Sequence, residues 1–182
     1  MAPHCVPVQL VKLIEDHFGR GSVVHGLRCT PGHPWDKLYF EWMKHADVFI
    51  PCLSETYLNS PACCEEFLEA CLVQAPDPED THRVVIPVLL GPLPWKYPSA
   101  VPDDKICLGP GKPALSRFPD ATKEQLLGQF GTRNAFPNPN DGLLFDNPEK
   151  NIPKLITLIE AAIENSRNSQ ACPTPPRTCI CR

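Results

Sequence analysis

The stretch Ala46–Phe67, "ADVFIPCLSETYLNSPACCEEF", decides the fold because it joins a continuous apolar run directly to a helix start. Its first half, "DVFIPCLS", is apolar at most positions, which is typical of a strand buried on both faces of a parallel sheet. Ser60 then predicts a helix N-cap with Pro61 at the first helical position, so "PACCEEFLEACLVQA" is expected to be a helix. A buried strand followed by a helix is the repeating unit of an α/β fold.

A second apolar run of the same kind, "RVVIPVLLGP", lies at residues 83–92. Pro51 and Pro87 interrupt the two runs, and each removes one ladder hydrogen bond, so both strands are expected to be short or bulged. "SVVHGLRC" at residues 22–29 predicts a further short strand. Strands of this type, alternating with helices, favour an open α/β fold with a parallel sheet.

Apolar residues at helical spacing predict the helices that surround these strands. Residues 6–21, "VPVQLVKLIEDHFGRG", have one apolar face and end in glycines. "WDKLYFEWMKH" at residues 35–45 and "ATKEQLLGQF" at residues 121–130 predict shorter helices. Residues 151–166 form a regular apolar stripe and predict a final helix.

The length of 182 residues suits one domain, which we expect to span residues 1–164. Within it, residues 93–149 are rich in proline and turn residues and predict an irregular region, with "KICL" as a short edge strand. Residues 167–182, "RNSQACPTPPRTCICR", offer little to pack, so a disordered tail is predicted there.

The composition limits the classes of partner and compartment. A formal net charge of −4 gives no basic excess, which argues against nucleic acid or an anionic membrane as the main partner. No apolar run reaches the roughly 18 residues of a spanning helix, and "MAPHCVPVQL" does not resemble a signal peptide. The ten cysteines are therefore expected to be reduced thiols of a cytoplasmic protein.

The segment Ala46–Phe67 resembles the centre of a TIR (Toll/interleukin-1 receptor) domain. In that family a buried strand ends in Ser, followed by an aromatic residue, a second Ser and a helix start with Cys-x-x-Glu. "VVIPVLLGP" is similar to the family's fourth strand, and "RCTPG" to the loop after its second strand. The matching positions are Ser54, Tyr57, Ser60, Cys63 and Glu66 in the centre and Arg28, Pro31 and Gly32 in the loop.

This resemblance is best over residues 8–92, and it implies a flavodoxin-like three-layer sandwich with a parallel sheet. The family's first strand, which lies between its second and third in the sheet, has no counterpart. That gap is compatible with an incomplete chain, an alternative start, a partner-dependent variant, or filling by "HCVPV" at residues 4–8. Two motif positions also depart from the family, with Ala62 in place of Trp and Cys29 in place of Asp.

Glu66 is the candidate catalytic residue that the resemblance implies, because TIR proteins that cleave NAD use a helix glutamate at this motif position. A carboxylate there can stabilise an oxocarbenium-like transition state at the ribose. Helical geometry places Glu65 and Glu69 on one face, predicted to be solvent-exposed at Glu65, and turns Glu66 by about 100°. Ser54, Tyr57 and Arg28 would bind the substrate. The alternative is an acid favoured only by the helix dipole.

Arg28, Pro31 and Gly32 are predicted to form an interaction loop, because the family uses this loop to dock on other TIR domains. An exposed Pro-Gly turn on a rigid sheet suits binding, although an ordinary turn would have the same sequence. The expected function is therefore a cytoplasmic signalling module of innate-immune type, acting through TIR–TIR association and self-association. The alternative is a TIR-type NAD⁺ glycohydrolase in which NAD is the substrate and no resident cofactor is needed.

The cysteines are predicted to be mostly structural. Cys64 and Cys71 fall on an apolar stripe of the helix and belong in the core. Cys63 lies near the helix N-terminus, where the dipole lowers a thiol pKa, so a redox role is the alternative for it. No metal site is expected, because adjacent cysteines cannot supply tetrahedral spacing and Cys29 with His33 lacks a second pair.

Overall fold

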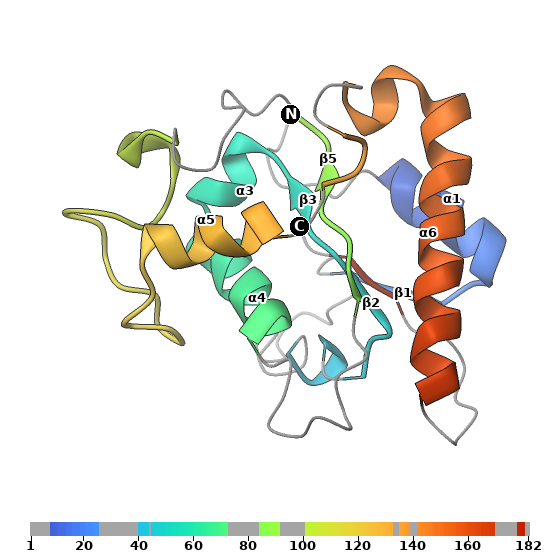
Figure 1. Ribbon diagram of the computed structural model, residues 1–182, viewed down its shortest axis with the longest axis horizontal. Helices are drawn as coiled ribbons and strands as arrows, with labels where there is room; N and C mark the ends of the chain where they lie inside the picture. The colour runs from blue at the N-terminus through green and yellow to red at the C-terminus, as the bar shows by residue number, and fades with distance from the viewer. Residues whose placement is uncertain are drawn as a thin grey trace.

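The computed structural model describes residues 8–25, 40–43, 45–72, 84–91, 101–132, 135–138, 142–169 and 178–180. Its strands lie between two groups of helices, with α1 and α6 on one side and α3, α4 and α5 on the other (Figure 1). The helices are α1 Val8–Phe18, α3 Glu55–Asn59, α4 Pro61–Leu72, α5 Lys123–Thr132 and α6 Pro148–Ser169. Short 3₁₀ turns are η3 Asp103–Lys105 and η5 Leu144–Asp146. The predicted three-layer α/β sandwich is confirmed.

The strands are short and parallel, and the prolines divide them as the sequence predicts. One sheet has the order β1-β6-β2-β4, and the other pairs β3 with β5. Pro51 separates β2 from β3, and Pro87 lies between β4 and β5. Backbone hydrogen bonds continue past both prolines, because the Val88 amide donates to the Pro51 carbonyl at 2.8 Å. The strands are β1 Val23–Val24, β2 Val48–Ile50, β3 Cys52–Leu53, β4 Val84–Val85, β5 Val88–Leu89 and β6 Thr178–Ile180.

Phe136 extends the sheet beyond β5. Its carbonyl accepts from the Leu89 amide at 2.8 Å, and its own amide donates to the Pro87 carbonyl at 2.7 Å. Val88 and Phe136 form a parallel bridge. Across the molecule the order is therefore β1, β6, then β2 and β3, then β4 and β5, and last Phe136, which is the arrangement of a flavodoxin-like sheet.

The sequence predicts a disordered tail over residues 167–182, and the structure contradicts this at 167–169 and at 178–180, while residues 170–177 and 181–182 lie outside the described residues. Residues 167–169 belong to α6, and Thr178–Ile180 form β6 between β1 and β2. Thr178 pairs with both Val23 and Val48, and Cys179 pairs in the same way with the residues that follow. Thus β6, which lies near the end of the sequence, occupies the position in the sheet where the family has its first strand. Residues 4–7 of "HCVPV" lie outside the described residues.

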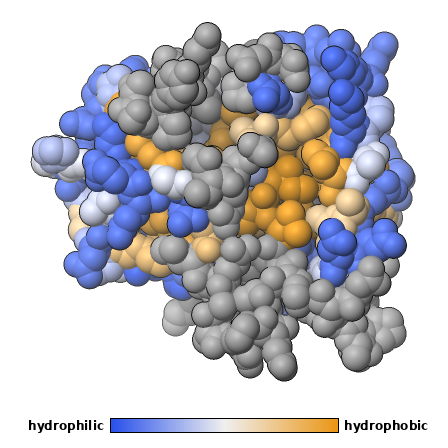
Figure 2. Space-filling model, viewed as in Figure 1, coloured by the Kyte–Doolittle hydropathy of each residue, from blue (hydrophilic) through white to orange (hydrophobic). Residues whose placement is uncertain are grey.

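Alternating strand residues divide the core into two halves, as the two-residue period of a strand requires. On the face of the molecule that Figure 2 shows, hydrophobic residues gather over the middle and hydrophilic ones lie toward the outer edges. One half packs Val48, Ile50 and Val88 against α1 and α6, and the other packs Phe49, Leu53 and Leu89 against α4 and α5. Each such side chain, fully buried, contributes about 1.5–3 kcal/mol.

The segment "KICL" does not form the predicted edge strand. Lys105 ends η3, and residues 106–108 form bends, with all three of these side chains buried. The Cys107 amide donates to the Leu58 carbonyl at 2.8 Å, so the segment is held against the end of α3 and has no strand neighbour in the described part of the chain. The interpretation failed because apolar residues in this segment pack against a helix.

Candidate functional site at the carboxyl edge of the central strands

Two serines organise the transition from strand to helix at this edge. Ser54 follows β3 in extended conformation, and its Oγ accepts a hydrogen bond from the Tyr57 amide at 3.1 Å, which starts α3. The Ser60 Oγ accepts from the Cys63 amide at 3.4 Å, and the Ser60 carbonyl accepts from the Cys64 amide at 3.0 Å. The predicted N-cap of α4 at Ser60 is confirmed. The two caps fix where the motif residues leave the sheet.

The ends of β3 and β5 lie side by side at Ser54. Gly91 follows β5 closely, and a Cβ built on it would lie 3.4 Å from the Ser54 Cβ. This is ordinary van der Waals contact, so the two strand ends meet with little space between them. Ligands of open α/β sheets bind beyond the carboxyl ends of the strands, which makes this edge the candidate site.

Glu66 is almost completely buried, with 1% of its surface exposed. It lies on α4 one turn after Cys63, which is 5% exposed. Tyr57 is 2% exposed and belongs to the core cluster that includes Phe67. The motif side chains of α3 and α4 are thus packed inside the molecule.

The structure places only some of the predicted site residues. Ser54 is joined to Tyr57, and Ser60 to Cys63, by the capping hydrogen bonds described above. The predicted loop residues Arg28, Pro31 and Gly32, together with Cys29 and His33, lie outside the described residues. Their roles remain predictions.

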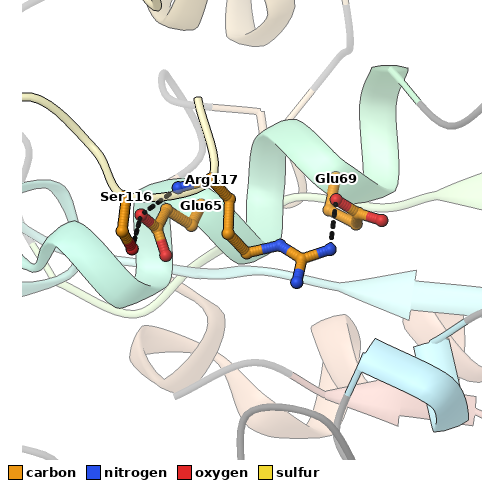
Figure 3. A network of polar contacts seen from close by, with 4 residues as sticks. All are labelled: Glu65, Glu69, Ser116 and Arg117. Atoms are coloured by element: carbon orange, nitrogen blue, oxygen red, sulfur yellow. Dashed lines mark hydrogen bonds and ion pairs between the residues drawn. The ribbon is translucent and has the colours of Figure 1, made fainter. Parts of the chain in front are cut away.

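Glu65 is buried, at 9% exposure, so its predicted exposure to solvent is wrong. One carboxylate oxygen, Oε1, accepts from the Ser116 hydroxyl at 2.8 Å and from the Arg117 amide at 3.1 Å (Figure 3). Arg117 also donates from Nη2 to Glu69 Oε2 at 3.3 Å, and its guanidinium lies 3.8 Å from the centre of the Phe40 ring. The prediction that Glu65 and Glu69 share a face is confirmed.

This group of polar contacts was not found from the sequence, because Ser116 and Arg117 lie in the region predicted to be irregular. Helical spacing gives the direction of a side chain and not the segment that covers it. The contacts attach residues 116–117 to the same helix that bears Glu66 (Figure 3).

Replacing Glu65 with Ala is expected to lower the free energy of unfolding by about 1–3 kcal/mol, because two part-buried hydrogen bonds to a buried carboxylate are lost. Urea unfolding followed by circular dichroism measures the change. Glu55→Ala is the matched control, since Glu55 makes an exposed ion pair with Lys105, at 2.6 Å, and should change stability much less. Equal losses in the two variants would contradict the structural role of Glu65.

Cys64 and Cys107 are buried cysteines that meet at the end of α3. The Cys64 thiol donates to the Leu58 carbonyl at 3.4 Å, the same carbonyl that accepts from the Cys107 amide. Interaction with the Cys64 thiol lowers the pKa of Cys107, whereas interaction with the Cys107 thiol, together with burial, raises the pKa of Cys64. The predicted core positions of Cys64 and Cys71 are confirmed.

Cys107 is expected to react with iodoacetamide at a lower pH than Cys64, because only the thiolate is nucleophilic and a lowered pKa makes it available earlier as pH rises. Labelling is carried out from pH 6 to 10, in steps of about one pH unit, and mass spectrometry of tryptic peptides measures the labelled fraction of each cysteine. Cys64→Ala removes the thiol that lowers the Cys107 pKa, so the Cys107 labelling profile of this variant should move to higher pH. An unchanged Cys107 profile in that variant would show that the thiols do not interact.

A surface pocket of about 500 Å³ lies between α4 and α5, lined in part by Leu68, Arg117 and Gln125. Its lining does not include Ser54, Tyr57 or Glu66.

Among the helices of the described ranges, none is long and apolar enough to cross a membrane. Among the residues that the structure describes, there is no group of three or more His, Cys, Asp or Glu side chains that could hold a metal ion.

Comparison with known proteins agrees with the fold and the motif. The model of the TIR domain family matches residues 10–109, a span that includes the Ser54–Glu66 motif and the Arg28–Gly32 loop. No match was found among curated proteins or among solved structures. Because the family model covers more than half of the chain and the sheet order is flavodoxin-like, the chain belongs to the TIR domain family.

Proposed function

We propose that this chain is a cytoplasmic signalling module of innate-immune type that acts by associating with other TIR domains, including copies of itself. The observation that carries the proposal is the family match over residues 10–109, because TIR domains generally associate with one another. The rigid frame that this role needs is supported by a sheet covered on both faces. Arg28, Pro31 and Gly32 follow β1 in the sequence and are the proposed contact residues.

Replacing Pro31 with Ala should weaken self-association at least about tenfold, because the Pro-Gly turn that shapes the contact loop would lose its restriction. Sedimentation velocity of the purified full chain over a concentration series measures the dissociation constant. Pro110→Ala is the matched control, because Pro110 also precedes a glycine, Gly111, and is exposed on the described surface. Equal association of the two variants and the unmodified chain would refute the role of this loop.

Cleavage of NAD at the nicotinamide–ribose bond is the second candidate function, and the burial of Glu66 favours it. An acid that served only the dipole of α4 could remain exposed, as Glu124 does in the first turn of α5. Burial of an acid to 1% exposure is uncommon outside paired or functional positions. In this reaction Glu66 would stabilise the developing ribosyl cation, with Ser54, Tyr57 and Arg28 holding the substrate. Water and NAD⁺ would give nicotinamide, ADP-ribose and a proton.

Nicotinamide release from NAD by the full chain, free in solution and clustered on beads, tests this candidate. If the chain is an enzyme, release is lost in Glu66→Gln and kept in Glu124→Gln, because Glu124 is exposed on α5 and distant in sequence from the motif. Absence of release in every assembled state would refute the enzymatic function and leave association as the function. Release that persists in Glu66→Gln would refute the catalytic role of Glu66.

A further inference from the structure

The centre of the sheet holds a strand that comes from outside the family-matched region. The TIR match ends at residue 109, whereas β6 is Thr178–Ile180. β6 is parallel to both neighbours, with Thr178 and Cys179 paired to β1 and all of β6 paired to β2. The family-matched part thus provides a slot between β1 and β2, and a distant segment fills it (Figure 1).

β6 is held in this slot by backbone pairing, which any extended peptide could make. Backbone pairing in parallel register fixes the position of Cys179 opposite Val24 on one side and Phe49 on the other. Such strand addition depends on main-chain hydrogen bonds for affinity and on alternate side chains for selectivity. A slot with paired strands on both sides can offer twice the main-chain contacts of a single sheet edge.

The end of α6 lies near the start of the strand that fills the slot. At the entrance of the slot, Ser166 near the end of α6 donates from Oγ to Asp47 Oδ1 at 3.2 Å, and Asp47 precedes the Thr178 partner Val48. The end of α6 therefore lies close to where β6 begins. Residues 170–177, "QACPTPPR", join the two elements and contain Pro173, Pro175 and Pro176.

We propose that the slot between β1 and β2 accepts residues 178–180 of a second copy of this chain in exchange for the chain's own strand. The segment 178–180 is the occupant whose register fits, and the copy's strand would make the same contacts, so exchange costs little beyond the connection. A short connection gives an effective concentration on the order of 1 mM, so exchange between copies becomes significant where chains are clustered. This inference rests on the proposed self-association and gives it a mechanism.

Peptide binding to the full chain tests the slot without any partner protein. The probe is a fluorescein-labelled peptide "PRTCICR", corresponding to residues 176–182, used under reducing conditions. Its control is "PRTPICR", in which proline removes the amide and blocks strand pairing. The acceptor chains are the unmodified protein, Cys179→Pro, whose own strand cannot pair, and the matched variant Cys179→Val, which keeps its amide. Fluorescence anisotropy gives the dissociation constants.

The expected result is saturable binding of "PRTCICR" to Cys179→Pro, at least about tenfold tighter than to the unmodified chain or Cys179→Val, because their own strands compete. The proline peptide should bind none of them. Equal binding to all three chains, or no binding to Cys179→Pro, would overturn the proposal. If Cys179→Pro does not fold alone, it is refolded with each peptide. A cooperative melt recovered only with "PRTCICR" supports the slot, and no recovery overturns it.

Exchange between copies is tested by sedimentation of the full chain at rising concentration, with dimer expected in the unmodified protein and at least tenfold less in Cys179→Pro. Dimer formation unaffected by Cys179→Pro would overturn exchange. The failure of the proposed function has a different signature. If the peptide binds but the full chain shows no self-association, the proposed function is refuted. If association is present and is lost in Pro31→Ala, but the peptide does not bind, only the slot is refuted.

Discussion

A chain that ends at Ser169, and so lacks β6, is expected to lose most of its cooperative stability. Without Thr178–Ile180, buried backbone groups of β1 and β2 lose their partners in the middle of the sheet. Each unsatisfied group costs about 1–3 kcal/mol, and the total stability of a domain is only about 5–15 kcal/mol. Urea unfolding followed by circular dichroism should therefore give a greatly reduced midpoint or no cooperative transition.

The control for this truncation is the full chain with Cys179→Val, which keeps the backbone of β6 and should unfold near the midpoint of the unmodified protein. A truncated chain with an unchanged urea midpoint would mean that β1 and β2 are stable without a strand between them. That outcome would contradict the role of β6 in completing the sheet.

Phe67→Ala is expected to lower the free energy of unfolding by about 3–5 kcal/mol. Phe67 is completely buried on α4, and its ring stacks on Phe130 of α5 with centroids 3.9 Å apart and planes 8° from parallel. Substitution leaves a cavity where α4, α5 and the sheet meet, and it removes the ring contact. The measurement is chemical unfolding of the purified full chain with fluorescence and circular dichroism as independent probes.

Phe67→Leu is the matched control, because a leucine fills much of the volume and should lose clearly less stability than Ala. A loss below about 1 kcal/mol for Phe67→Ala would be too small for a buried aromatic side chain at the centre of a packed cluster. Such a result would mean that α4 does not pack against α5 as described.

The strands and most helices could be predicted because their signals are local. The apolar runs at residues 48–53 and 84–89 are dense enough to indicate burial on both faces, and the prolines marked their interruptions correctly. The stripe of α6 likewise predicted a final helix, although the helix is longer at each end than residues 151–166. Local periodicity determines which face of an element is buried.

β6 could not be predicted because nothing in its own sequence requires a strand. "TCI" is short, follows a proline-rich segment and has no alternating pattern long enough to recognise. Its conformation depends on β1 and β2, more than 120 residues earlier in the chain, which leave a place between them. The resemblance did indicate that a central strand was missing, and the strand that takes its place comes from the other end of the sequence.

The candidate site was predictable in part. Ser54 and Ser60 carry local capping signals and both make the expected hydrogen bonds. Spacing also placed Glu65 and Glu69 on one face correctly. It could not show that residues 116–117 cover Glu65, since a contact between distant segments leaves no periodic signal. The burial of Glu66 was equally inaccessible from spacing alone.

The central claim is that Thr178–Ile180 complete the TIR sheet from within, and amide hydrogen exchange of the full chain measured by NMR tests it most directly. The account predicts that the amides of β6 that pair with β1 or β2 exchange at least about 100-fold more slowly than in the free peptide "PRTCICR", with protection close to that of Val48–Ile50. Exchange of all β6 amides at the rate of the free peptide, while Val48–Ile50 remain protected, would contradict it.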